Sequence, residues 1–326
     1  DEQGDWLRGR INRSNLPESI RIWRLITPEN YQPIDWQLDF KSGFRWSERS
    51  YHTSIIIGPK LGADIKIPWE LSRCQHLPQL ALCALLSKEG DKRFLAAKIY
   101  LDEIRAQLLD FISTNPPRFG VNWSCTMDVA IRLSNWLLTL DLLAVNDLYI
   151  DDEAMSVISR SVTSHAIYVA GHLEWSEYRR SNHYLADLVG LIYASRRLPE
   201  SSRTDAWLVF AAKELMNEAS IQFHLEGSSY EGSTNYHRLS AEILLFGVAL
   251  IAGLSKERLA KLKNYSASAI TIRPPFPDDP LRQYSDFNGL LTLVPTNITK
   301  LLWAAARFTD FITRPDGRIL QIGDTD

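Results

Sequence analysis

Two short polar segments carry the residue types best suited to chemistry, and they lie about fifty residues apart in the sequence. Residues 181–183 read Ser-Asn-His, and residues 230–238 read Tyr-Glu-Gly-Ser-Thr-Asn-Tyr-His-Arg. Each segment runs directly into an apolar stretch with helical periodicity, so we expect each to lie at the start of a helix. Amide, imidazole, phenol and charged groups gathered at helix starts are typical of a catalytic or binding site.

Each of these residues also has a structural explanation. Asn182 at a helix start is most readily an N-cap, although Ser181 could take that place and leave the Asn182 side chain for a ligand. His183 taken alone fits a hydrogen-bonded histidine at a helix end. Tyr236 taken alone fits a core residue, but it follows a loop rich in glycine and serine that can approach a ligand closely. The residues themselves leave both interpretations open.

Two further clusters combine aromatic and charged side chains. Glu70 and Arg73 are three residues apart on an expected helix, which is the spacing of an intrahelical ion pair. Trp69 precedes them, and Trp123 and Arg132 mark the entry to a later helix. If these side chains line a cleft, they are suited to contact a sugar.

Composition and motifs exclude several classes of function. The net charge of −3 over 326 residues does not favour nucleic acid or an anionic membrane as partner. No apolar run reaches the length of a membrane span. The seven histidines include no metal-binding pair at helical spacing, and G-x-S-x-G, P-loop and dinucleotide motifs are absent. We therefore expect no metal among the site residues and no cofactor required by them.

Nine stretches with helical periodicity follow one another with short linkers. They cover residues 69–88, 92–112, 125–143, 151–172, 182–198, 204–224, 234–253, 256–266 and 296–311. This succession predicts an all-α fold, either a helical solenoid or an α/α toroid, and the lack of a strict repeat weakens the solenoid. Residues 1–60 are expected to be irregular and to pack on the helices, and the last residues to contain a short β segment.

Taken together, these segments resemble the heparinase II/III family of polysaccharide lyases. The matching pieces run in the family's order: residues 64–73, 120–132, 181–183, 231–237 and 322–326. The resemblance implies an incomplete α/α toroid as catalytic domain over residues 61–312. Residues 313–326 would begin a linker or a β-sheet domain otherwise absent from this chain, and a structural metal in that β domain is compatible with the family.

The resemblance also implies a reaction, β-elimination at a uronic acid. The proton on C5 is removed and the glycosidic oxygen on C4 leaves. Asn182, supported by His183, would neutralise the uronate carboxylate, which makes the C5 proton more acidic. Tyr236 would act as acid and base. The substrate-binding residues would be Glu231, His237, Arg238, Trp69, Glu70, Arg73, Trp123 and Arg132. The family usually adds a histidine from the β domain, and no position here matches it.

Two other functions also fit the sequence. A glycoside hydrolase on a similar toroid would need two carboxylates across a cleft, for which Glu70, Asp128 and Glu231 are candidates. A non-catalytic polysaccharide-binding or assembly protein would keep the cleft without the reaction. The expected partner is in each instance an acidic polysaccharide or oligosaccharide of undetermined identity. No signal peptide is visible; the resemblance favours a periplasmic or extracellular setting and leaves the cytoplasm open, and oligomeric state is not predicted.

Overall fold

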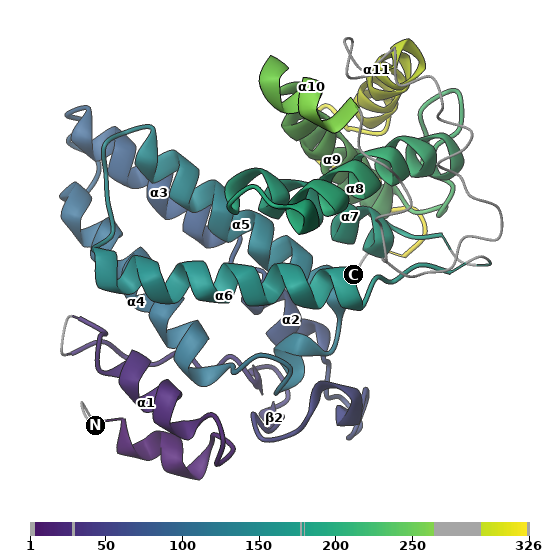
Figure 1. The fold of residues 1–326 in the computed structure, drawn as a ribbon. Coiled ribbons are helices and arrows are strands. Elements are labelled where there is room, and N and C mark those ends of the chain that lie inside the picture. Colours follow the sequence, from purple (N-terminus) through teal and green to yellow (C-terminus); the bar gives the residue numbers. More distant parts are fainter. Residues whose placement is uncertain (1–3, 28–29, 177, 179, 264–294, 325–326) are drawn as a thin grey trace. The chain divides into compact units, whose positions relative to one another are not determined.

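Helices make up most of the protein. The structure, a computed structural model, describes residues 4–27, 30–176, 178, 180–263 and 295–324 (Figure 1). In this part of the chain the strands are limited to a two-residue antiparallel pair, β1 (Leu38–Asp39) and β2 (Phe44–Arg45). The predicted all-α class is therefore confirmed. Among the described helices, none combines the length and hydrophobicity that crossing a bilayer requires.

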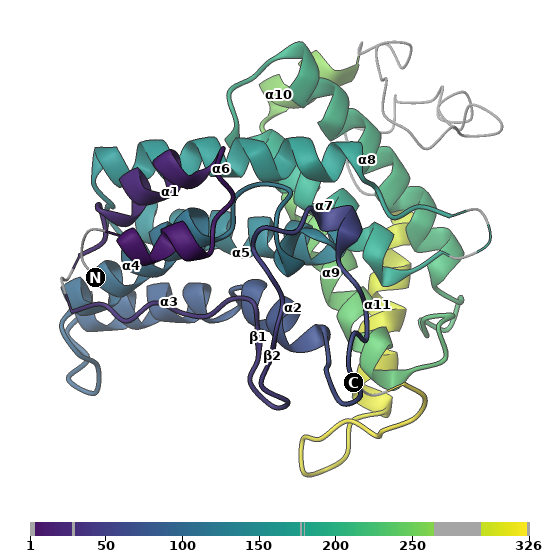
Figure 2. The same cartoon turned by 90° about the horizontal axis from the view of Figure 1, so that it is seen from below.

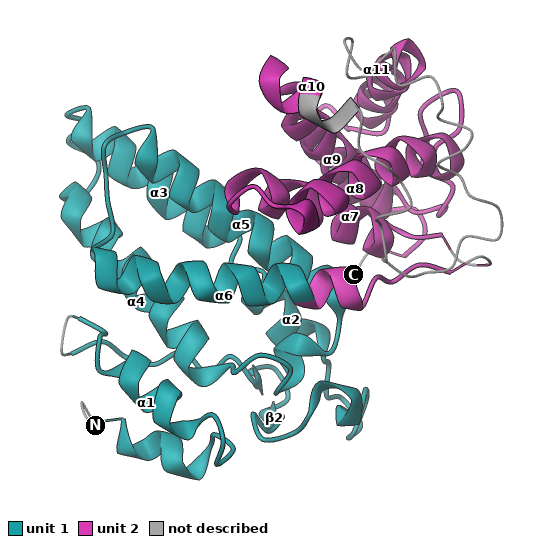
Figure 3. Cartoon of the chain, in the orientation of Figure 1, with its two compact units in different colours: residues 1–167 teal, residues 168–326 magenta. Residues whose placement is uncertain are grey.

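The chain divides into two compact units, residues 1–167 and 168–326 (Figure 3). The unit boundary falls inside the span 61–312 that we expected to be one domain. The expected division at residues 60 and 312 stays a prediction, because compactness alone does not test it.

The first unit is built from neighbouring helices that pack in succession. α3 lies alongside α4 and α5, and α1 packs on α4 (Figure 2). The ring of Phe111 on α4 lies 5.5 Å from that of Trp136 on α5 and 5.2 Å from that of Trp36, which forms an aromatic core. The helices and 3-10 segments of this unit are η1 (Asp5–Gly9), α1 (Leu16–Trp23), η2 (His52–Ser54), α2 (Lys66–Ser72), α3 (His76–Lys88), α4 (Ala97–Thr114), η3 (Val121–Trp123), α5 (Thr126–Ala144) and most of α6 (Asp152–Gly171).

Helix α1 corrects the expectation that residues 1–60 are irregular. It is only eight residues long, and it buries Ile20 and Trp23 against Leu7 and Ile11 of the preceding segment. A helix this short is marginal alone and is stabilised by such packing. Leu16, Ile20 and Trp23 recur at helical spacing, so the sequence did carry a signal for this short helix.

The stretch predicted as one helix over residues 69–88 is broken into α2 and α3. The break lies at Cys74, which is buried and has a φ of +55°, a left-handed conformation that no continuous helix contains. Pro78 then falls in the first turn of α3, where its missing N–H costs nothing. Pro78 was the sequence signal for this break, since proline is disfavoured in a helix interior.

The second unit packs α8 and α9 against α7, with α11 on α8 and α9 (Figure 1). α7 is buried on nearly all sides, which fits its apolar sequence from Leu185 to Ala194. At Gly247 of α9 an added Cβ would lie 2.5 Å from Leu215 and 2.7 Å from Val189, so a larger residue here would require both side chains to shift. The helices are α7 (Asn182–Arg197), α8 (Ser202–Gln222), α9 (Thr234–Ala252), α10 (Lys256–Lys263) and α11 (Thr296–Phe311). Successive packing of neighbouring helices is the construction expected of an incomplete α/α toroid.

The end of the described chain folds back onto α9. Thr313 and Ile319 form a single antiparallel bridge that closes a turn. The short β segment expected at the end of the chain is therefore this one bridge and not a longer strand. The chain then runs along the start of α9, where the Thr234 N–H donates to the carbonyl of Ile322 at 3.0 Å. This contact brings the C-terminal segment next to the second polar segment of the sequence.

Candidate functional site

Asn182 begins α7, and Glu231 from the loop before α9 binds it twice. The Glu231 carboxylate accepts the Asn182 backbone N–H at 3.0 Å and its side-chain amide at 3.0 and 3.2 Å. A carboxylate at a helix start satisfies an otherwise unpaired N–H and interacts favourably with the helix dipole. Ser181 holds the N-cap position without a side-chain cap. Asn182 is thus not the cap; Glu231 supplies that function from a distant part of the sequence.

The Glu231 carboxyl group is perturbed by this environment. Burial raises its pKa, and the hydrogen bonds from Asn182 oppose that change without cancelling it. A carboxyl group with a raised pKa takes up a proton more readily when a second anion approaches. Glu231 is therefore suited to a place beside an anionic ligand.

His183 lies on the same first turn of α7. Its Nδ1 is 3.0 Å from Oε2 of Glu174, and its side chain is 42% exposed. The backbone N–H of Glu174 in turn donates to Asp187 of α7 at 2.7 Å. The loop before α7 is therefore tied to the helix and orients the imidazole, which a ligand can reach from solvent.

Tyr236 lies in the first turn of α9. Its N–H donates to the Ser233 hydroxyl at 3.1 Å, which makes Ser233 the N-cap of this helix. The phenol donates to Oδ2 of Asp324 at 3.0 Å, and the Ser233 hydroxyl donates to the carbonyl of Asp324. Asp324 therefore fixes the orientation of the phenol through its side chain while its own backbone is held by Ser233.

Gly323 allows this docking. Its φ is +77°, and an added Cβ would lie 2.4 Å from the carbonyl oxygen of Gly232. A side chain at this position would collide with the backbone just before α9. The glycine is thus required by the close approach of two backbones.

The structure brings four of the predicted site residues to one end of the second unit. Asn182 and His183 lie on the first turn of α7, and Tyr236 lies on the first turn of α9, which packs on α7. Glu231 joins these two helix starts. The shared location was expected from the sequence only through the family resemblance.

His237 is placed differently from the expectation of substrate contact. It is 1% exposed, with Nδ1 accepting the Ser229 N–H at 3.2 Å and Nε2 lying 3.0 Å from the Thr309 hydroxyl. Since that hydroxyl donates to Ala305, it accepts from His237, which assigns the proton to Nε2. Burial lowers the pKa of His237, so the ring is neutral. These contacts indicate a structural residue that joins the loop to α11.

Arg238 follows on the exposed side of α9. Its Nη2 lies 3.5 Å from Oδ1 of Asn235. The side chain is exposed, and its contact with a substrate stays a prediction.

In the first unit, Arg73 pairs with two carboxylates. Its Nε lies 2.6 Å from Oδ1 of Asp128, and its Nη1 pairs with Glu70, which is the intrahelical ion pair predicted from their spacing. The Trp69 indole donates to the carbonyl of Val121 at 2.9 Å. Contact of Trp69, Glu70 and Arg73 with a substrate stays a prediction.

Arg132 and Trp123 belong to the core of the first unit. Arg132 is 0% exposed, donates to Nε2 of His165 at 3.0 Å, and stacks with its guanidinium 4.4 Å from the Phe111 ring. Burial and the Arg132 charge hold the pKa of His165 well below its usual range. Trp123 is 1% exposed and donates to Asn115 at 3.1 Å. Their burial argues against direct substrate contact, and neither enters the proposed site.

A buried polar network under the Asn182 turn was not identified from the sequence. Glu218 of α8 pairs with Arg180 and accepts from Nε2 of Gln222 at 2.8 Å, and that amide also donates to the carbonyl of Ser181 at 3.2 Å. Burial raises the pKa of the neighbouring Glu214 to about 7. The signal available was the i, i+4, i+8 spacing of Glu214, Glu218 and Gln222, which puts three polar groups on one helix face.

Asp324 and Glu174 were also missed as site residues. Asp324 was part of the matching segment 322–326, but no role followed from its sequence position. Glu174 lies in a linker without a motif. Both are recognised only through their contacts with Tyr236 and His183.

Comparisons with known proteins agree with the resemblance seen in the sequence. The model of the family described as Heparinase II/III N-terminus matches residues 22–293. A heparinase III gene product is 16% identical over 94% of this chain and 41% of its own, with a TM-score of 0.46. A mutant of the heparan sulfate lyase HepC from Pedobacter heparinus is 17% identical over 96% of this chain and 40% of its own, with a TM-score of 0.47. The chain thus spans about two fifths of these structures. A search among curated proteins found no significant match.

Proposed function

The chain belongs to the heparinase II/III N-terminus family, and on that premise we propose that it is the helical part of a polysaccharide lyase. The proposed reaction is β-elimination in a uronic-acid-containing polysaccharide. The observation that carries the proposal is the joining of two helix starts by Glu231, which brings the amide of Asn182 and the phenol of Tyr236 to one end of the second unit.

The first requirement is to stabilise charge at the uronate carboxylate. When the C5 proton leaves, negative charge moves onto this group, and a donor aimed at it lowers the barrier. The Asn182 amide already binds a carboxylate, that of Glu231, which is the same functional group. In the substrate complex, the uronate takes these hydrogen bonds and Glu231 takes up a proton, which its raised pKa facilitates. The start of α7 adds the favourable end of a helix dipole.

The second requirement is proton transfer at C5 and at the leaving oxygen. The Tyr236 phenol first releases its proton to solvent. The phenolate oxygen then takes the C5 proton, and the electrons of that bond form the C4–C5 double bond as the C4–O4 bond breaks. The phenol formed then donates its proton to O4, which returns Tyr236 to the phenolate. Asp324 holds the phenol in one orientation before the reaction. The proposed steps require no cofactor at these residues.

The hydrolase alternative has less support at two of its three candidate carboxylates, Glu70 and Asp128. Glu70 and Asp128 both pair with the same guanidinium, that of Arg73, and Asp128 is buried. A hydrolase needs one carboxylic acid that donates to the leaving group. Carboxylate oxygens already occupied by arginine are poorly placed for that role.

Product analysis by mass spectrometry tests the proposal. The panel contains heparan sulfate, alginate and capsular uronic-acid polysaccharides. A lyase gives fragments with an unsaturated uronate at the new end, which contain one water less than the fragments of hydrolysis. Saturated fragments would instead support the hydrolase. A polymer that binds and stays intact both with residues 1–326 and with the longest protein that the reading frame encodes around them would support the non-catalytic function.

A further inference from the structure

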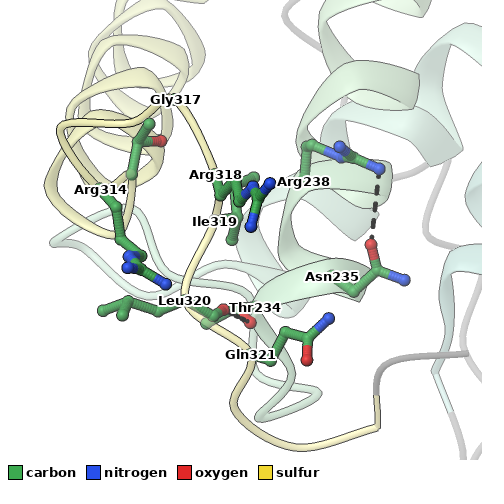
Figure 4. A pocket seen from close by; sticks show the side chains of 10 residues that line it. Thr234, Asn235, Arg238, Arg314, Gly317, Arg318, Ile319, Leu320 and Gln321 are labelled. Atoms are coloured by element: carbon green, nitrogen blue, oxygen red, sulfur yellow. Dashed lines mark hydrogen bonds between the residues drawn. The ribbon is translucent and has the colours of Figure 1, made fainter.

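A polar pocket of about 810 Å³ opens beside the start of α9 (Figure 4). One side is formed by Thr234, Asn235 and Arg238 of α9, and the other by the C-terminal turn over residues 313–321. This volume is in the range of pockets that hold a ligand of several rings. The pocket lies entirely within the second unit.

The pocket is strongly cationic. Arg238, Arg314 and Arg318 line it, and none of the described residues that line it carries a carboxylate. Arg314 lies 3.5 Å from Asp316, but both side chains are about half exposed, and such a pair holds an arginine weakly. In the described part of the chain, no ion pair engages Arg238 or Arg318. Three guanidinium groups around one space repel one another until an anion enters.

The wall that carries two of these arginines is held in shape by the backbone. The N–H of Arg314 donates to the carbonyl of Arg318 at 2.7 Å, and Gly317, at a φ of +79°, closes the turn between them. The next residues are fixed to α9, since the Ile322 N–H donates to the Thr234 hydroxyl at 3.1 Å. The arginine backbones therefore need no large rearrangement to receive a ligand, which favours binding.

The pocket lies beside the first turn of α9, which carries Tyr236. Asn235, which lines it, precedes Tyr236 in the sequence, and Gln321, which also lines it, is three residues from Asp324. Three residues span at most ~11 Å. A saccharide with its reacting carbon at Tyr236 can therefore place a substituent of a nearby sugar in this pocket.

We propose that Arg238, Arg314 and Arg318 form a subsite for an anionic substituent, a sulfate or a carboxylate, on a sugar near the cleaved uronate. The planar fork of arginine matches both groups with two parallel hydrogen bonds. This inference rests on the proposed function, which supplies the polysaccharide ligand, and it defines the class of substrate more narrowly. The polymer carries a second anionic group close to the uronate that reacts.

Binding without turnover tests the subsite. Isothermal titration in a Tyr236→Phe background uses three oligosaccharide probes of equal length: heparan sulfate, its desulfated counterpart, and an unsulfated oligouronate. Arg238→Gln and Arg318→Gln are compared with Arg203→Gln, an exposed arginine at the start of α8. We expect each pocket variant to lose about tenfold or more in affinity for the preferred probe, and Arg203→Gln to lose little.

The probes separate the two anionic groups. A loss confined to the sulfated probe identifies sulfate, and a loss with the oligouronate identifies carboxylate. If pocket and control variants bind every probe as tightly as the background protein, the subsite is wrong and these arginines are solvated surface charges. Arginine-dependent binding with no elimination by the longest protein that the reading frame encodes around residues 1–326 would keep the subsite and overturn the lyase proposal. Elimination by that protein with arginine-independent binding would do the reverse.

Discussion

The side-chain amide of Asn182 donates to both oxygens of Glu231, at 3.2 and 3.0 Å, and the backbone N–H of Asn182 donates to the same carboxylate. One carboxylate thus holds the start of α7 and occupies the group proposed to bind the uronate. This relationship connects the stability of the second unit to its chemistry.

Replacement of Glu231 tests that connection. Glu231→Gln keeps one oxygen acceptor but turns an amide donor toward one of the Asn182 donors, so a hydrogen bond at the helix start is lost. We expect a loss of about 1–2 kcal/mol in the free energy of unfolding, measured by urea denaturation. Glu242→Gln, at an exposed position of α9, is the matched control and should change little. Equal stability of the two variants would show that Glu231 does not hold α7.

Removal of Gly323 tests the docking of the C-terminal segment. Gly323→Ala puts a Cβ within 2.4 Å of the Gly232 carbonyl, so we expect the segment to separate from α9 and Asp324 to leave Tyr236. Hydrogen exchange should show faster exchange of the Thr234 and Ile322 amides. Gly317→Ala is the control, because Gly317 has a similar positive φ but no atom lies within 4 Å of the added Cβ. An effect seen only in Gly323→Ala therefore comes from the collision and not from backbone strain. Unchanged exchange in Gly323→Ala would contradict the close approach.

A buried carboxyl group in the first unit predicts a dependence of stability on pH. Burial raises the pKa of Asp110 from 3.8 to about 7, although hydrogen bonds from Ile34 and Tyr31 oppose this. Between these values the folded protein keeps a proton that the unfolded chain has released. Stability is therefore fully present at low pH and is lost as pH rises toward 7, by at most ~1.4 kcal/mol per pH unit from this group.

Asp110→Asn tests this origin of the pH dependence. The amide keeps an oxygen that can accept from Tyr31 and Ile34 and has no titrating proton. We expect the fall in unfolding free energy between pH 4 and about 7 to be smaller in this variant than in the parent. Glu89→Gln, at an exposed position, should keep the parent slope. An unchanged slope in Asp110→Asn would assign the dependence to other groups.

Helix positions were predictable because their signals are local. The starts at Asn182 and Thr234 follow from an apolar periodicity that begins directly after polar residues, and both agree with the structure. The break at Cys74 was missed, because its left-handed conformation depends on packing rather than on a preference of cysteine. Helix α1 was missed because it is only eight residues long and lies between irregular segments, although its apolar residues recur at helical spacing.

The contacts of the candidate site were less predictable. Glu231 and Asn182 are 49 residues apart, and Tyr236 and Asp324 are 88 apart, so no local pattern joins them. The burial of Arg132 could not be predicted from the sequence either, because its guanidinium contacts a histidine and an aromatic ring in the core. A charged residue near a motif therefore does not by itself indicate a place in a cleft.

The central claim is that Tyr236 transfers the protons of an elimination. The most direct measurement is the rise in ultraviolet absorbance from the conjugated C4–C5 double bond during incubation with the panel of polysaccharides. The experiment compares the parent protein, Tyr236→Phe and a control, Tyr230→Phe. Each is measured for residues 1–326 and for the longest protein that the reading frame encodes around them. The account predicts that Tyr236→Phe loses the rate by about 100-fold or more while it still binds substrate, and that Tyr230→Phe keeps the parent rate. A Tyr236→Phe variant that eliminates as fast as the parent would contradict it.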